Sequence, residues 1–97
     1  MDMWFAIETS IQDINQLLAR LYQPSAEDAD DELRILCSEV RHLDMRTVRV
    51  LTSKGQAPTV SMPTVDFNGQ SYKQIRQALR AFLQARREQF KKLVRQE

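Results

Sequence analysis

The residues that most strongly interrupt helices occupy only five positions in this chain. Its two glycines and three prolines are Pro24, Gly55, Pro58, Pro63 and Gly69. Proline removes a helix-forming amide and glycine is the next weakest helix former, so long helices are confined to the stretches between these positions. The distribution leaves three uninterrupted stretches: one before Pro24, one between Pro24 and Gly55, and one after Gly69.

Apolar residues in the first two stretches recur at the spacing of a helix face. In the first stretch, intervals of three and four residues separate Trp4, Ile7, Ile11, Ile14, Leu18 and Leu21. In the second, the same intervals separate Ala29, Leu33, Leu36, Val40 and Leu43. An amphipathic helix has this period. The pattern predicts helices over about residues 3–22 and 26–44, the second with a capping box at Ser25 and Asp28, that form an antiparallel hairpin.

Beyond the second predicted helix, the apolar period drops to two residues. Val48 and Val50 alternate with other residue types, which predicts a strand over about residues 46–52. The alternation resumes over about residues 58–67, where flanking prolines suit an edge strand because proline supplies no ladder amide. With a turn at Gly55 between them, the two segments predict a β-hairpin or a small antiparallel sheet.

The last helix has a clear start signal. Ser71 and Gln74 form a second capping box, and the tight turn that Asn68-Gly69 allows comes directly before it. The apolar period then predicts a helix over about residues 72–95. Together the elements predict a single α+β domain with an N-terminal antiparallel helix hairpin, a short β-hairpin or small sheet, and a long C-terminal amphipathic helix.

The chain is poor in side chains that carry out catalysis. Cys37 and His42 lie about 140° apart around a helix, so they cannot act as a pair from one face. One cysteine and one histidine cannot form a zinc site, and two isolated glycines cannot form a phosphate loop. The helix dipole accounts for the acids at residues 27–32, which lack the glycine and final glutamate of a calcium loop. We expect no catalytic residue, cofactor or metal, although a pocket with Cys37 or His42 beside a carboxylate would indicate an enzyme.

The N-terminal residues and the cysteine content bear on location. Asp2 and Glu8 interrupt the apolar residues at the start of the chain, so this segment resembles neither a signal peptide nor a membrane span. A single cysteine excludes an internal disulfide and indicates a reducing compartment. We therefore expect a cytoplasmic protein.

Arg86 interrupts the apolar face of the last helix, where it projects between Phe82 and Phe90. A buried guanidinium without a partner is costly. Either the helix has run past the core at this point, or Arg86 meets a carboxylate in another element or another chain. In the first case, the apolar residues at the end of the helix would be exposed unless a partner covers them.

These features predict a non-enzymatic module for protein–protein interaction. A core this small is naturally supplemented by association, so we expect a homodimer, or an adaptor or inhibitor that docks on another protein. Aromatic and arginine side chains are common interface anchors. The predicted partner-binding residues are Trp4, Phe5, Arg86, Phe90, Leu93 and Val94.

A basic strip on the last helix supports an alternative, a nucleic-acid-binding module. Residues 70–97 hold eight bases and two acids, whereas residues 1–45 hold ten acids and three bases. Five cations of the last helix project within about 60° of one another. They are Lys73, Arg76, Arg80, Arg87 and Lys91. Such a strip can contact phosphates, but a solvated helix surface has the same pattern.

Overall fold

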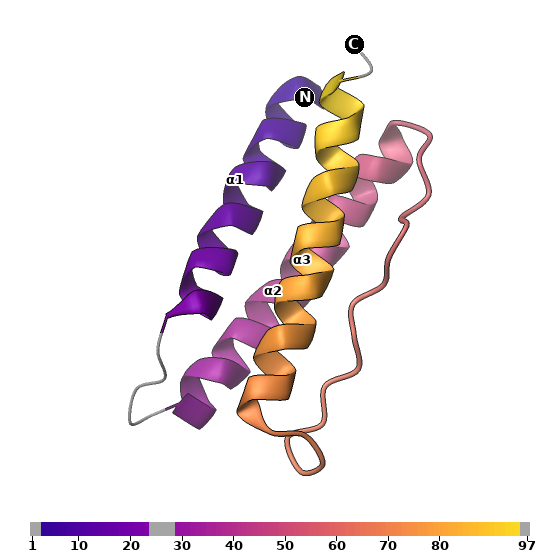
Figure 1. The fold of residues 1–97 in the computed structure, drawn as a ribbon. Coiled ribbons are helices and arrows are strands. Elements are labelled where there is room, and N and C mark those ends of the chain that lie inside the picture. The colour runs from indigo at the N-terminus through magenta and orange to yellow at the C-terminus, as the bar shows by residue number, and fades with distance from the viewer. Residues whose placement is uncertain (1–2, 24–28, 96–97) are drawn as a thin grey trace.

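Three long helices make up the chain in the computed structural model, which describes residues 3–23 and 29–95. Helix α1 spans Met3–Tyr22, α2 spans Ala29–Ser53 and α3 spans Tyr72–Arg95. They lie side by side in a bundle 44 Å long, with α1 antiparallel to both α2 and α3 (Figure 1). The described residues contain no strand. The fold is an all-α three-helix bundle, and the predicted α+β class is wrong.

The first predicted strand, over residues 46–52, is wrong because α2 continues through it. Thr47 and Leu51 are fully buried, and they extend at four-residue intervals the line of buried residues that contains Leu43. The β-branched residues of this segment favour a strand locally. Burial of one continuous helix face outweighs that preference, because helix propensity differs by less than about 1 kcal/mol between such residues.

A glycine ends α2. Gly55 has a φ of 74°, in the left-handed region that favours glycine. Its amide donates to the Thr52 carbonyl at 2.9 Å, and the Gln56 amide donates to the Leu51 carbonyl at 2.9 Å. These two bonds form a Schellman motif. The turn predicted between two strands is therefore the C-terminal cap of a helix.

Residues 54–71, here called the strap, return along the bundle from the end of α2 to the start of α3 (Figure 1). The strap side chains that pack against the core are Val60, Met62, Val65 and Phe67. The strand predicted over residues 58–67 is also wrong, because the alternation marks an extended chain whose apolar side chains contact helices. No second strand pairs with it among the described residues.

The start of α3 has the predicted capping box. The Gln74 amide donates to Ser71 Oγ at 3.1 Å, and the Ser71 amide donates to Gln74 Oε1 at 2.8 Å. Two free amides at the helix start are thus satisfied. The other predicted capping box, at Ser25 and Asp28, lies outside the described residues.

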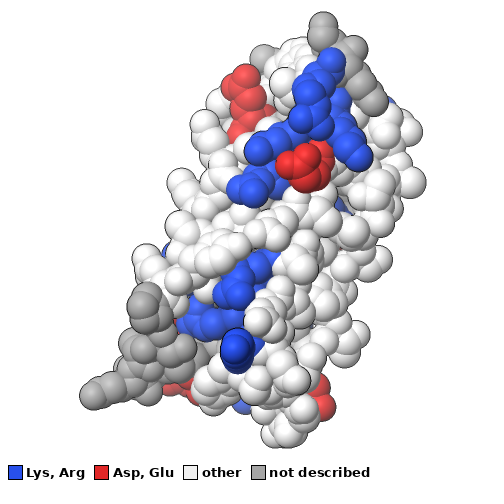
Figure 2. Space-filling view, in the orientation of Figure 1, with Lys and Arg blue, Asp and Glu red and all other residues white. Residues whose placement is uncertain are grey.

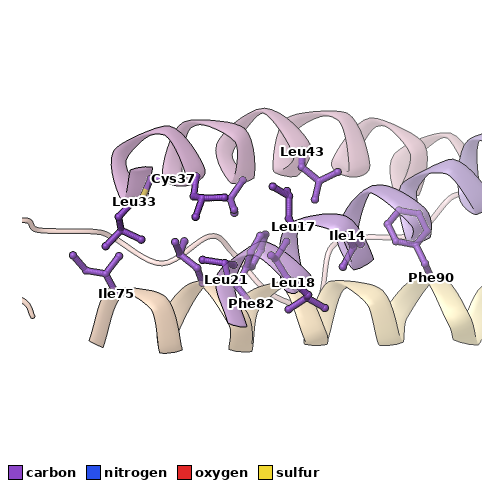
Figure 3. Close-up of a cluster of buried hydrophobic side chains, with 14 of the residues drawn as sticks. Ile14, Leu17, Leu18, Leu21, Leu33, Cys37, Leu43, Ile75, Phe82 and Phe90 are labelled. Atoms are coloured by element: carbon purple, nitrogen blue, oxygen red, sulfur yellow. The ribbon is translucent and has the colours of Figure 1, made fainter. Parts of the chain in front are cut away.

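Buried side chains from all three helices meet along the axis of the bundle (Figure 3). The buried core consists of Ile7, Ile14, Leu17, Leu18 and Leu21 of α1, Leu33, Leu36, Cys37, Val40, Leu43 and Leu51 of α2, and Ile75, Leu79, Phe82, Leu83, Phe90 and Leu93 of α3. Complete burial of one side chain of leucine size contributes about 1.5–3 kcal/mol. This apolar contact is the main force that holds the helices together.

Candidate interaction face

Most of the predicted partner-binding residues of α3 lie inside the bundle. Phe90 and Leu93 belong to the core, and Phe90 is 0% exposed (Figure 3). The helix therefore does not run past the core at these residues. Trp4 is half-buried and packs against the core. Phe5 and Val94, in contrast, are 64% and 41% exposed.

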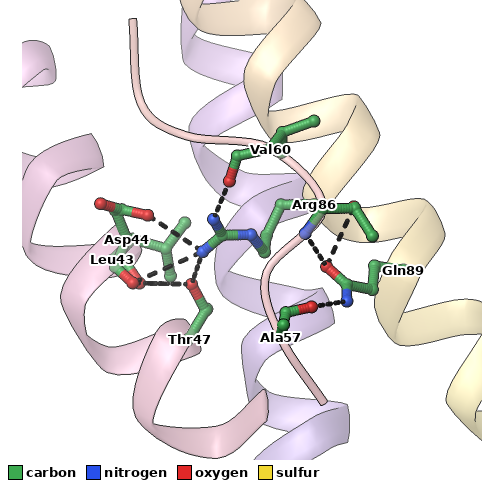
Figure 4. A network of polar contacts seen from close by, with 8 residues as sticks. Leu43, Asp44, Thr47, Ala57, Val60, Arg86 and Gln89 are labelled. Atoms are coloured by element: carbon green, nitrogen blue, oxygen red, sulfur yellow. Dashed lines mark hydrogen bonds and ion pairs between the residues drawn. The ribbon is translucent and has the colours of Figure 1, made fainter. Parts of the chain in front are cut away.

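Arg86 is paired within the chain, where α2, α3 and the strap meet (Figure 4). The residue is 1% exposed, and its guanidinium lies 3.0 Å from Asp44 Oδ1. It donates to Thr47 Oγ1 at 2.7 Å and to the Val60 carbonyl at 2.8 Å. Burial lowers the pKa of Arg86, and the Asp44 carboxylate opposes that shift. The carboxylate anticipated in another element is therefore Asp44, and Arg86 is buried away from any partner.

A second buried polar residue of α3 fixes the strap. Gln89 Oε1 accepts hydrogen bonds from the amide and the hydroxyl of Thr59, both at 3.1 Å. Gln89 Nε2 donates to the Ala57 carbonyl at 2.8 Å (Figure 4). On the other side, Val65 and Phe67 of the strap lie against α2. The strap thus covers the groove between α2 and α3.

Three of the five cations in the predicted basic strip bond to α1. Arg76 and Arg80 donate to the Leu21 carbonyl, at 3.0 and 3.3 Å. Arg87 donates to Asn15 Oδ1 at 2.7 Å. The Leu21 carbonyl belongs to the last turn of α1, where the helix dipole favours cations. These arginines bridge the groove between α1 and α3.

The other two cations of the strip, Lys73 and Lys91, are exposed. Figure 2 shows the basic side chains of this face in two separate groups, with an acidic residue inside the upper group. Glu88 also lies 3.9 Å from Arg95 on the outer surface of α3. The described surface therefore does not present the five cations as one continuous, free strip.

Cys37 and His42 lie in different surroundings. The buried Cys37 lines a pocket of about 280 Å³ beneath the strap, together with Val65 and Phe67. His42 is exposed, and its Nδ1 lies 2.9 Å from the Ser38 carbonyl. In the described ranges, no group of three or more His, Cys, Asp or Glu residues is placed to hold a metal ion.

We expect Cys37 to react slowly with iodoacetamide in the folded protein. Burial raises the pKa of the Cys37 thiol, and the thiolate is the reactive form. Alkylation at pH 7.5, followed by intact-mass spectrometry, should be at least about tenfold slower in buffer than in 8 M urea. Equal rates in the two solutions would contradict the burial of this side chain.

One acid at the start of α2, Asp30, has a structural role. Asp30 accepts hydrogen bonds from Arg34 Nε and from the Tyr72 hydroxyl, both at 2.9 Å. These two bonds lower the pKa of the Asp30 carboxyl. Glu27 and Asp28, which belong to the same acidic run, lie outside the described residues. Asp30 thereby links the start of α2 to the start of α3.

An open, mainly apolar groove lies between α1 and α2, near the start of α1 and the end of α2. Its volume is about 240 Å³. The residues that line it are Phe5, Ala6, Thr9, Ser10 and Asp13 of α1, and Arg46 and Val50 of α2. Phe5 is the most exposed large apolar side chain of the described chain. A phenylalanine exposed to this degree beside a groove offers apolar area to a partner.

The groove between α1 and α2 continues as a polar pocket of about 410 Å³. It is lined by Asp13, Gln16, Leu17, Arg20, Glu39, His42 and Arg46. Two ion pairs cross it: Arg46 with Asp13 at 3.1 Å, and Arg20 with Glu39. Each carboxylate near His42 is therefore held by an arginine, and none of the lining residues forms a hydrogen-bonded acid–base pair with His42. We call the two pockets together the α1–α2 face.

Of the residues that line this face, the sequence pattern had singled out Phe5 as a predicted partner-binding residue. Arg46 and Val50 were assigned to a strand, which separated them from α1. The available signal was the four-residue interval that runs from Leu43 through Thr47 to Leu51. Thr47 is polar, so the apolar pattern was interrupted there and the continuation of the helix face was not recognised.

No family model, curated protein or solved structure matches this chain. None of its described helices is long and apolar enough to cross a membrane.

Proposed function

We propose that this chain is a small, non-catalytic helical module that binds a helix of another polypeptide on its α1–α2 face. The observation that carries the proposal is the apolar groove at Phe5, which is 64% exposed beside Ala6 and Val50. Helix-in-groove recognition uses this kind of surface, in which apolar anchors are flanked by charged side chains. The Asp13–Arg46 ion pair supplies flanking charges here.

The other two grooves of the bundle support this choice of face. The strap covers the groove between α2 and α3, fixed by Arg86 and Gln89. Arginine side chains bridge the groove between α1 and α3 through Leu21 and Asn15. A helix that docks at the apolar end of the α1–α2 groove, beside Phe5, displaces neither set of contacts, and the Arg20–Glu39 and Arg46–Asp13 ion pairs lie across the polar part of the same groove.

The nucleic-acid alternative has less support. Phosphate binding requires cations that are free to contact the backbone of the nucleic acid. Arg76, Arg80 and Arg87 already bond to groups of α1. Of the five, Lys73 and Lys91 are exposed, and within residues 3–23 and 29–95 their ammonium groups have no hydrogen bond or ion pair.

Photocrosslinking inside the cells that naturally produce this chain tests the proposed function. A benzoylphenylalanine in place of Phe5 should form adducts with a polypeptide, and the crosslinked peptide should show apolar residues at helical spacing. Val50→Glu in the same chain should reduce the yield at least about tenfold, because a charge then enters the apolar groove. Benzoylphenylalanine in place of the exposed Gln77 of α3 is the matched control. Equal yields at the two positions, or no adduct at position 5, would refute the proposal.

A further inference from the structure

We infer that the partner on the α1–α2 face is a second copy of this chain, in antiparallel orientation. The inference rests on the proposed function, because it names the occupant of the same groove. Two copies related by a two-fold axis present the same surface to each other. Such a surface must be complementary to itself when one copy is reversed end to end.

Charge along α2 satisfies this condition. Glu32, Glu39 and Arg46 are seven residues apart, so they follow one line along the helix, on the side that faces α1. Ile35, His42 and Arg49 are also seven residues apart, and they follow a second line along α2 next to the first. The N-terminal half of α2, the lower half in Figure 1, is therefore acidic on this side. The C-terminal half, the upper half in Figure 1, is basic.

Pairing within the chain leaves charges of opposite sign at the two ends of the face. Arg20 neutralises Glu39, and Asp13 neutralises Arg46. Beyond the residues that line the two pockets, the Arg49 guanidinium near the C-terminal end of α2 has no hydrogen bond or ion pair in the described chain, and the same holds for the Glu32 carboxylate near its N-terminal end. Exposed Asp31, next to Glu32, adds a further negative charge.

Exposed apolar side chains also lie toward both ends of the face. Phe5 is 64% exposed near the upper end, and Ile35 is 55% exposed near the lower end. An axis near His42, close to the middle of α2, brings the upper end of one copy against the lower end of the other. Arg49 then meets the acidic half of the partner helix, and Phe5 meets the end that carries Ile35. A parallel arrangement would bring like charges together, which costs free energy.

The long side of the molecule that carries the α1–α2 face is large enough to hold a standard interface. The molecule measures 44 × 21 × 20 Å, so one long side projects roughly 900 Å², and each partner in a standard interface buries about 800 Å². A dimer that covers most of this long side would therefore reach the range of specific complexes.

Sedimentation velocity over a concentration series tests the inference with paired charge reversals. The wild-type chain should sediment as a dimer. Arg49→Glu and Glu32→Arg should each raise the dimer Kd at least about tenfold, because two-fold symmetry repeats every new repulsion. A mixture of the two variants should recover a Kd within about threefold of the wild-type value, since both contacts are then attractive. Lys92→Glu, on the exposed outer side of α3, is the matched control and should leave the Kd unchanged.

The outcomes separate this inference from the proposed function. A wild-type chain that stays a monomer of 11.3 kDa at about 1 mM would overturn the self-association. So would a dimer whose Kd is unchanged by both charge reversals. If position 5 still crosslinks to a different polypeptide, the proposed function holds and only the identity of the partner is wrong. If position 5 gives no adduct while the chain forms a dimer, another surface joins the copies and both proposals fail.

Discussion

Replacing Arg86 by alanine is expected to lower the free energy of unfolding by about 3 kcal/mol. The guanidinium is almost fully buried and joins Asp44, Thr47 and the carbonyl of Val60. Removal of one member of a buried pair leaves its partners without compensation, at a cost of about 3–5 kcal/mol. The lower value applies because the Asp44 side chain is 24% exposed and can be hydrated. Urea denaturation followed by circular dichroism measures the loss.

The double variant Arg86→Met with Thr47→Val provides the control for this prediction. It replaces Arg86 and Thr47 by apolar groups of similar size, so it fills the space that alanine leaves and removes one of the three groups that would lose their donor; the Asp44 carboxylate and the Val60 carbonyl lose theirs in both variants. We expect it to be at least about 1 kcal/mol more stable than Arg86→Ala. A loss below about 1 kcal/mol for Arg86→Ala would show that the network contributes little to the fold.

Truncation of Phe90 to alanine is expected to cost about 3–5 kcal/mol. Phe90 is 0% exposed, so its removal loses apolar burial and leaves a cavity between the helices. A small domain has a total stability of about 5–15 kcal/mol, so the variant should unfold at much lower urea concentration. The midpoint of the urea transition, at unchanged slope, is the measurement.

Val94→Ala is the matched control at the end of the same helix. Val94 is 41% exposed, and its truncation should change stability by less than about 0.5 kcal/mol. The pair also tests the assignment of Phe90 to the core. If Phe90 instead contacted a partner, its truncation would weaken association and leave the monomer as stable as the wild type.

The regular apolar spacing allowed α1, α3 and α2 as far as residue 44 to be predicted, but not residues 45–53 of α2 or the strap. Spacing identifies a helix when its apolar face is unbroken, as it is from Trp4 to Leu21. Residues 46–52 are rich in β-branched side chains, and a buried threonine at position 47 interrupts the line. Whether such a segment becomes a strand depends on a second strand, and local sequence contains no information on that partner.

At the candidate site, too, local sequence features could be predicted and contacts between distant residues could not. Arg86 could be recognised as an anomaly because its place in the apolar period was local information. Its partner Asp44 lies 42 residues away in the chain, and only the packing of α2 on α3 brings them together. Phe5 was predicted as a partner-binding residue, and the structure exposes its side chain, whereas the groove beside it requires α2 to extend as far as Val50.

Side-chain contacts, rather than a ladder of backbone hydrogen bonds, hold the strap in place. Across the described chain, no amide from residues 60–65 donates to a backbone carbonyl. These amides should therefore exchange with deuterium through local opening, at free energies well below that of global unfolding, while amides inside α2 and α3 stay protected. Opening of the strap would uncover Cys37 without unfolding a helix, because Val65 and Phe67 line the same pocket. Thiol labelling and amide exchange would then report one opening equilibrium.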